Sequence, residues 1–230
     1  MKSYLVAATK TWHRRAFQKH APSLPGHWHL VDRPEALTRS LVEEIAPRYI
    51  FFAHWSWTVP QDILALADCV CFHASDVPYG RGGSPIQNLI VRGHRDTKLT
   101  ALRMVEELDA GPVYLKRDLS LEGRAQDIFE RMADLTWGMI ASLVEHEPHP
   151  EPQNGDATVF KRRTPDQSVL PGAGPLNRLY DHIRMLDADG YPHAFLEHGE
   201  FRLDFTEASL DEGKLTARVT LTKEMRRNAR

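Results

Sequence analysis

The residues best suited to chemistry lie in the segment that surrounds His73. Residues 70–90 read VCFHASDVPYGRGGSPIQNLI, so a glycine-rich loop follows the histidine and Ser84 and Pro85 then begin a predicted helix. Glycines let the backbone approach a ligand closely, and the start of a helix offers free N–H groups. The segment predicts a ligand-binding loop beside a histidine. A strand–loop–helix connection without a ligand is the alternative for this segment taken alone.

Asp109 is a second candidate, because it precedes Ala110, Gly111 and Pro112 in a predicted tight turn after a strand. Aspartate also initiates turns through its own side chain. On this segment alone, the turn is a sufficient explanation for Asp109.

The elements that must position these residues follow an alternating pattern in the first part of the chain. Short apolar runs predict strands at residues 4–8, 27–31, 49–53 and 69–73, and the segments between them predict helices at 11–20, 34–46 and 61–67. Alternation with short connections predicts an α/β fold with a doubly wound, mostly parallel sheet. Ligands bind beyond the carboxyl ends of such strands, where His73 and an aromatic loop at 54–60 would lie.

The remainder of the chain predicts a second, smaller region. Helices are expected at 84–92 and 123–145, strands at 99–106 and 113–117, and a proline-rich break at 147–155. We therefore predict a catalytic domain at 1–150 and a small α+β accessory region at 151–230. Within that region we expect a linker, a helix at 176–186 and short strands at 193–197, 200–205 and 215–221.

Taken together, the segments around His73 and Asp109 resemble the formyltetrahydrofolate-dependent formyltransferases. The family pattern H-x-S-x-x-P-x-x-R-G-x-x-P-I-Q runs without a gap from His73 to Gln87, and a D-x-G-P turn begins at Asp109, 36 residues after the histidine. The resemblance covers about residues 1–150. It implies a Rossmann-like core and N10-formyltetrahydrofolate as the formyl-donating cosubstrate, with no metal.

The resemblance also implies roles for individual residues. His73 would stabilise the oxyanion as a hydrogen-bond donor or acid, and Asp109 would orient His73 and handle protons. The residues implied in binding the folate donor are Trp55, Trp57, Val59, Arg81, Met104, Val105 and Glu106.

One position departs from the family pattern. Cys71 stands where the family has an asparagine thought to help hold the oxyanion, and a thiol is a much weaker donor. Either other donors replace the asparagine, with Asn88 and backbone N–H groups of residues 80–83 as candidates, or the chain is a degenerate member. We favour replacement, because His73, Asp109 and the arginine–glycine loop are all present.

The region after residue 150 bears on the acceptor. It contains 12 Lys and Arg against 13 Asp and Glu, whereas nucleic-acid binding uses a concentrated positive surface. The stretches ATVFKRRTPDQSVL and LNRLYDHIRMLDADGYPHAF resemble the joining segment and tail of short nucleotide-sugar N-formyltransferases. This implies a small-molecule acceptor, a UDP-linked 4-amino-4,6-dideoxy sugar, and no nucleic-acid partner. The candidates for acceptor binding are Lys10, Arg81, Asn88, Arg162 and Arg163.

Other functions fit parts of the same sequence. A methionyl-tRNA formyltransferase would carry a larger, basic C-terminal domain. A folate-binding relative without catalysis would account for Cys71, and a hydrolase would release formate with water as the acceptor.

The overall composition restricts the cellular compartment in which the protein is expected. The 230 residues carry 29 Lys and Arg against 31 Asp and Glu, and no apolar run approaches the roughly 18 residues of a membrane span. We expect a cytoplasmic protein without a membrane partner, whose start is a buried strand and not a signal peptide. Cys69, Cys71 and His73 lie on one predicted strand without a fourth ligand, so no metal is expected. The short C-terminal strands have edges that need covering, which is compatible with a homodimer.

Overall fold

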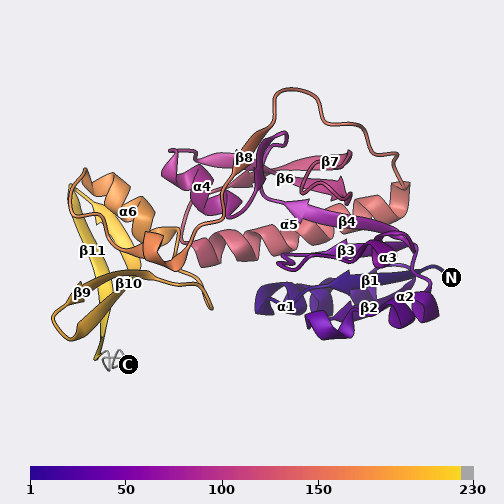
Figure 1. Cartoon of the computed structure of the whole chain (residues 1–230), viewed down its shortest axis with the longest axis horizontal. Helices are drawn as coiled ribbons and strands as arrows, with labels where there is room; N and C mark the ends of the chain where they lie inside the picture. Colours follow the sequence, from indigo (N-terminus) through magenta and orange to yellow (C-terminus); the bar gives the residue numbers. More distant parts are fainter. Residues whose placement is uncertain (224–230) are drawn as a thin grey trace, which may run out of the picture.

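A six-stranded sheet forms the centre of the larger part of the molecule in the computed structural model, which describes residues 1–223 (Figure 1). The strand order is β2-β1-β3-β4-β6-β7. The strands are β1 (Ser3–Ala7), β2 (His27–Val31), β3 (Tyr49–Phe52), β4 (Asp68–His73), β6 (Asp96–Arg103) and β7 (Val113–Ser120). The first four are mutually parallel, whereas β6 and β7 pair antiparallel. The predicted α/β fold with a mostly parallel sheet is confirmed. The arginine-rich end, residues 225–230, lies outside the described residues.

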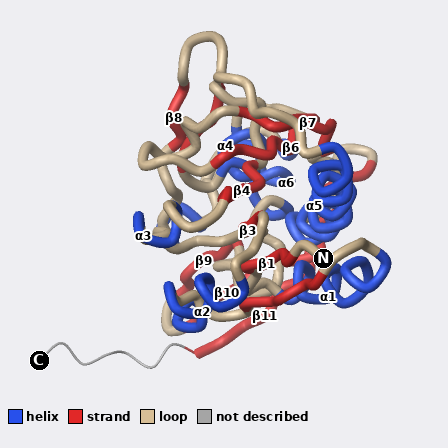
Figure 2. The backbone as a smooth tube through the Cα atoms, turned by 90° about the vertical axis from the view of Figure 1, so that its right-hand side faces the viewer, coloured by secondary structure: helices blue, strands red, loops and turns tan. Residues whose placement is uncertain are grey.

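Helices cover both faces of this sheet. They are α1 (Thr11–His20), α2 (Arg39–Ile45), α3 (Gln61–Leu64), α4 (Pro85–Val91) and α5 (Ala125–His146). Alternate residues of β1 enter two separate cores: Tyr4 and Val6 pack in the cluster that contains α1 and α5, and Leu5 and Ala7 pack in the cluster that contains α2 and α3. Figure 2 shows α1 and α5 on one side of the strands and α2 and α3 on the other. This two-sided burial explains why the strands read as continuous apolar runs.

The single helix predicted at 34–46 is two elements. A short 3-10 helix, η2 (Pro34–Ala36), comes first, and α2 begins after Thr38. The Thr38 hydroxyl accepts the Leu41 N–H at 3.2 Å, which is N-capping that restarts the helix. The hydrogen bond of Thr38 therefore divides a segment whose apolar periodicity predicted one continuous helix.

A small parallel pair of strands that the sequence analysis did not predict lies beside the sheet. It joins β5 (Tyr79–Gly82) to β8 (Thr158–Phe160). A Cβ on Gly82 would lie 2.5 Å from the Phe160 carbonyl oxygen, and one on Gly83 would lie 2.5 Å from the Arg162 backbone. The glycines after His73 therefore let the later segment approach the loop.

The C-terminal part is a helix on an antiparallel sheet. A 3-10 turn, η3 (Pro165–Ser168), leads to α6 (Leu176–Arg184), which packs against the sheet of order β11-β10-β9. The strands are β9 (Ala194–His198), β10 (Phe201–Asp211) and β11 (Lys214–Lys223). The strands β10 and β11 are longer than predicted because Glu212 and Gly213, both with positive φ, form a two-residue hairpin turn. The division at residue 150 stays a prediction.

Within the described residues, none of the helices combines the length and the apolar character that crossing a membrane requires.

Candidate active site

His73 and Asp109 come together although they are far apart in the chain. His73 ends β4, and its Nδ1 lies 3.4 Å from Asp109 Oδ2, with both side chains about nine-tenths buried. The Nε2 atom is 2.8 Å from the Gly80 carbonyl oxygen. A carbonyl only accepts, so the Nε2 atom carries the hydrogen of this bond and the Nδ1 edge faces the carboxylate. A histidine–carboxylate pair of this kind can orient the imidazole and pass a proton.

The turn that holds Asp109 is unusually constrained. Asp109 has φ of +54°, a left-handed conformation that non-glycine residues seldom adopt. A Cβ on Gly111 would lie 1.7 Å from the Arg103 carbonyl oxygen, so the turn packs directly on the end of β6. The Asp109 carboxylate also accepts the Gly82 N–H at 2.9 Å. One carboxylate thus fixes both the histidine and the glycine loop.

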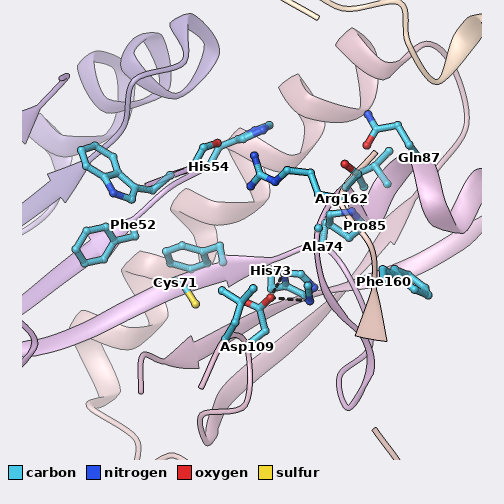
Figure 3. Close-up of a pocket in the computed structure, with 18 of the residues that line it drawn as sticks. Phe52, His54, Cys71, His73, Ala74, Pro85, Gln87, Asp109, Phe160 and Arg162 are labelled. Atoms are coloured by element: carbon cyan, nitrogen blue, oxygen red, sulfur yellow. Dashed lines mark hydrogen bonds and ion pairs between the residues drawn. The ribbon is translucent and has the colours of Figure 1, made fainter. Parts of the chain in front are cut away.

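The pair lines a cavity of about 510 Å³, a size typical of small-molecule sites. Figure 3 shows His73 and Asp109 at the bottom of the view, with Phe52, Cys71 and His54 along one side. The other lining residues include aromatic and aliphatic side chains from several elements, among them Trp55, Trp57, Phe129, Met104, Met132, Leu108, Phe160 and Tyr191. The cavity is mostly apolar with a few polar groups, as expected for a ring-binding site.

Cys71 lies in the cavity lining, two residues before His73 on β4. Side chains two apart in a strand share a face, so the thiol and the imidazole face the same space. Burial, together with the negative charge of Asp109, raises the pKa of the Cys71 thiol. Cys71 therefore presents a protonated thiol at this place. Both cysteines are free.

The residues predicted to bind folate divide into two groups. Trp55, Trp57 and Met104 line the cavity. Val59 is buried behind it in the core beneath α3, whereas Val105 and Glu106 lie outside the lining on an exposed turn. The predicted tryptophan loop is therefore the part of this set that reaches the cavity.

Arg81 and Asn88 lie outside the cavity lining and support its loops. Arg81 donates to the Gln153 side chain at 2.9 and 3.0 Å and to Glu107 at 3.3 Å. Gln153 in turn donates to the Asp109 and Gly111 carbonyl oxygens. Arg81 thus supports, through Gln153, the turn that holds Asp109.

The Asn88 amide donates to three backbone carbonyl oxygens, those of Gly83, Ser84 and Lys161. These bonds direct the amide hydrogens away from the cavity, toward the loop itself. Ser84 also differs from its predicted role, because its hydroxyl accepts the Arg163 N–H at 3.1 Å and forms no cap with α4.

The remaining predicted cations lie near the other end of the cavity. Arg162 is in the lining, and Lys10 lies 4.9 Å from the ring centroid of Tyr191, which lines the cavity. Arg163 donates to the Gln167 carbonyl oxygen, and burial lowers its pKa. The structure places Arg162 in the cavity lining and Lys10 beside the lining residue Tyr191, whereas the Arg163 side chain is bound to Gln167.

Several lining residues were not predicted. Phe129 and Met132 belong to the apolar face of α5, where periodicity indicates only core. Phe160 follows the predicted proline-rich break at 147–155, and no sequence signal marks it as a lining residue. His54 begins the predicted aromatic loop and was the one available indication.

Within residues 1–223, no cluster of three or more His, Cys, Asp or Glu side chains is arranged to hold a metal ion.

Comparison with known proteins places this site in a family. A solved structure described as methionyl-tRNA formyltransferase from Clostridium thermocellum superimposes with a TM-score of 0.95 at 40% identity, over 97% of this chain and 100% of that chain. The chain belongs to the formyltransferase family. The family model for the methionyl-tRNA formyltransferase C-terminal domain matches residues 165–222.

Other matches support the same family, but they cover only part of the relative or share only the fold. Methionyl-tRNA formyltransferase of Campylobacter curvus is 30% identical over 173 residues, covering 74% of this formyltransferase chain and 56% of the relative. The chain spans about half the length of the curated relatives it matches. A sugar N-formyltransferase from Shewanella matches with a TM-score of 0.61 at 17% identity, over 98% of this chain and 99% of that one, a likeness of fold alone.

The predicted nucleotide-sugar acceptor is wrong on these matches, and so is the prediction of no nucleic-acid partner, because the similar sequences are methionyl-tRNA formyltransferases. The prediction relied on the balanced charge of residues 151–230. The methionyl-tRNA formyltransferase C-terminal model matches inside that same segment. A balanced total charge therefore does not separate the two acceptor classes.

Proposed function

We propose that the chain transfers a formyl group from N10-formyltetrahydrofolate to the amino group of methionyl-tRNA. The observation that carries this proposal is the end-to-end match, at 40% identity, to the methionyl-tRNA formyltransferase structure of Clostridium thermocellum. The convergence of His73 and Asp109 in one cavity supports it from the chemistry.

The cavity suits a flat heterocycle at the end nearest the tryptophan loop. Phe52, Trp55 and Met104 supply apolar surface, and the Trp55 Nε1 is buried and has no hydrogen-bond partner among the described residues. A buried donor without a partner is costly, and a ring that offers an acceptor relieves that cost. Folate rings offer both flat apolar faces and ring acceptors, so this end is the proposed donor site.

The proposed reaction is an acyl transfer. The neutral amine attacks the formyl carbon, a C–N bond forms, and the carbonyl electron pair moves to oxygen. Collapse of this tetrahedral species breaks the bond to N10, which leaves with a proton. The net change moves one proton from the amine to N10, and the His73–Asp109 pair is placed to accept and return it.

Besides proton transfer, the reaction requires electrostatic stabilisation of the oxyanion. The Nε2–H of His73 is already donated to the Gly80 carbonyl oxygen, so the proposed donor to the oxyanion is Nδ1, after it has taken the proton from the amine beside Asp109. Cys71 contributes little in this proposal, since a thiol is a weak donor. Of the backbone groups expected to replace the family asparagine, the Gly82 N–H is donated to Asp109 and the Gly83 N–H to the Phe160 carbonyl oxygen, so neither is free for the oxyanion.

The test uses purified protein, N10-formyltetrahydrofolate and methionyl-tRNA, with formylmethionyl-tRNA measured by mass spectrometry. His73→Gln and Asp109→Asn should each lower turnover by about 100-fold or more, as for loss of a general acid–base group. Asp118→Asn is the matched control, because Asp118 is an exposed carboxylate paired with Lys98 on β7. Near-wild-type turnover in either site variant would exclude the assigned roles. Formate release without formylmethionyl-tRNA would exclude the acceptor.

A further inference from the structure

The sheet order creates a crevice beside the catalytic pair. The chain passes from β1 to β2 on one side and then returns to β3 on the other side of β1. The segments that leave β1 and β3 therefore diverge at their carboxyl ends, which is where ligands bind in open α/β sheets. Lys10 follows β1 and His54 follows β3, so both stand at this crevice.

Two cations lie at this end of the cavity, Arg162 in its lining and Lys10 beside the lining residue Tyr191. Lys10 Nζ lies 4.9 Å from the Tyr191 ring centroid and 5.7 Å from that of Trp12, and burial lowers the Lys10 pKa. Arg162 lines the cavity and projects toward His54 from the segment after β8 (Figure 3). Among residues 1–223, no carboxylate lies within salt-bridge distance of either cation, in contrast to Arg81 and Arg184. Partly desolvated cations without a counter-ion favour an anionic ligand.

Tyr191 contacts both His54 and Phe129 at this end of the cavity. Its hydroxyl lies 2.8 Å from His54 Nε2, and its ring packs on Phe129 with centroids 5.0 Å apart. Burial, with the charge of Lys10 adding to it, lowers the pKa of His54 to about 3. The imidazole is neutral at physiological pH, so the positive charge at the crevice comes from Lys10 and Arg162.

The geometry points to an anion subsite in which Lys10 and Arg162 bind a phosphate group of the acceptor. The identity of that acceptor rests on the proposed function. Both side chains are suited to phosphate, arginine as a two-pronged donor and lysine as a point charge.

The separation fits an aminoacylated RNA end. Strands lie about 4.8 Å apart, and β4 is two strands from β1, so the crevice is roughly 10 Å from His73. In an aminoacylated terminal nucleotide, about eight covalent bonds of roughly 1.5 Å separate the amine from the 5′-phosphate, a reach of roughly 10 Å when extended. The amine can therefore lie at the His73–Asp109 pair while the phosphate lies between the two cations.

The test measures binding without turnover. The probes are 3′-deoxy-3′-(L-methionylamino)adenosine with and without a 5′-phosphate, titrated calorimetrically against the full chain. For the wild-type chain we expect the phosphate to tighten binding by about 10- to 100-fold, as for charge-assisted hydrogen bonds. Lys10→Met and Arg162→Met should each remove about tenfold of that gain, and Arg162→Lys should recover part of it. The matched control is Lys161→Met, an exposed neighbour outside the cavity lining, which should keep the full gain.

Equal affinity of the two probes, no binding of either at millimolar concentration, or a gain that survives in both Met variants would overturn the subsite. These outcomes are independent of catalysis. A chain that fails to formylate methionyl-tRNA but retains the phosphate gain would contradict the proposed function while supporting the anion subsite. In a catalytically active chain, Lys10→Met should raise KM for methionyl-tRNA with little change in kcat.

Discussion

Cys69 and Cys71 lie on β4 in buried surroundings that raise the pKa of their thiols and so lower their reactivity. Burial, followed by the negative charge of Asp68, raises the pKa of Cys69 to about 12. Burial and Asp109 raise that of Cys71 as well. The nucleophile in alkylation is the thiolate, so both residues should be inert in the folded chain, although Cys71 lines the cavity.

We predict that iodoacetamide at pH 8 alkylates Cys69 and Cys71 at least about 1000-fold more slowly in the folded chain than in urea, because the thiolate fraction falls tenfold for each pH unit of raised pKa. Peptide mass spectrometry over time measures each site separately. The urea-unfolded chain is the control, and rapid labelling of Cys71 in the folded chain would contradict the prediction.

His13 is a buried histidine whose two ring nitrogens have no hydrogen-bond partner among the described residues. It is 1% exposed, and burial, with the nearby His54 adding to it, lowers its pKa well below 6.5. The unfolded chain therefore binds a proton below pH 6.5 that the folded chain excludes. The stabilising effect is present above that pH and is lost as the pH falls below it.

We predict that the free energy of unfolding falls between pH 6.5 and pH 5, and that His13→Leu makes this fall shallower by about 1.4 kcal/mol per pH unit. Urea titrations at several pH values measure the slope. His198→Gln, at an exposed position on β9, is the control and should leave the slope unchanged. An unchanged slope in His13→Leu would show that His13 does not exclude the proton.

At the scale of elements, the geometry of the His73–Asp109 pair depends on turns that join strand ends. The turn at Gly111 packs against the end of β6, and the same turn presents Asp109 to β4 and to the glycine loop. Packing between backbone segments thus sets the position of the Asp109 side chain. The glycine is required for space, since a Cβ would meet a carbonyl oxygen that cannot move independently of β6.

We predict that Gly111→Ala lowers stability by about 1–3 kcal/mol, as for overpacking, and lowers turnover by at least about tenfold, because Asp109 is displaced. Gly138→Ala is the matched control. It adds the same methyl group at an exposed place on α5 with nothing within 4 Å, and should stabilise by about 0.5–1 kcal/mol. Denaturant titrations and formyl-transfer assays test both, and a neutral Gly111→Ala would contradict the packing argument.

At the scale of the whole molecule, the C-terminal part is joined to the catalytic part through buried polar bonds. Arg184, at the end of α6, is 1% exposed and donates to the carbonyl oxygens of Leu121 and Gly123 at 2.6 and 2.8 Å. Its Nε donates to Asp181 at 2.7 Å. Tyr191, from the same part, reaches the cavity. The C-terminal part therefore contributes to the shape of the site.

We predict that Arg184→Lys destabilises the chain by about 2–3 kcal/mol, because an ammonium cannot reproduce the planar fork that satisfies two carbonyl oxygens and a carboxylate. Arg218→Lys, in an exposed pair with Glu207, is the control and should change stability by less than about 0.5 kcal/mol. Urea unfolding measures both, and equal effects would argue against the buried role.

Local sequence patterns were sufficient to predict most of the fold. Strand runs such as those at β1 and β3 are apolar because both faces are covered, and the alternation with helices predicts the parallel sheet. The pattern at His73 and Asp109 indicated the donor chemistry and the family. The pair β5–β8 escaped prediction because three- and four-residue strands carry no measurable periodicity, and their pairing depends on glycines that leave room for a distant segment.

The sequence alone determined which residues could do chemistry and which elements would carry them, because residue type and period are local properties. Only the tertiary structure decided where the cations lie. Arg162 lines the cavity and Lys10 lies beside the lining residue Tyr191, whereas Arg81 donates to Gln153 and Arg163 donates to Gln167. The direction of a side chain depends on partners brought from far along the chain, and total charge carries no such direction. For the same reason, counting charges in residues 151–230 gave the wrong acceptor.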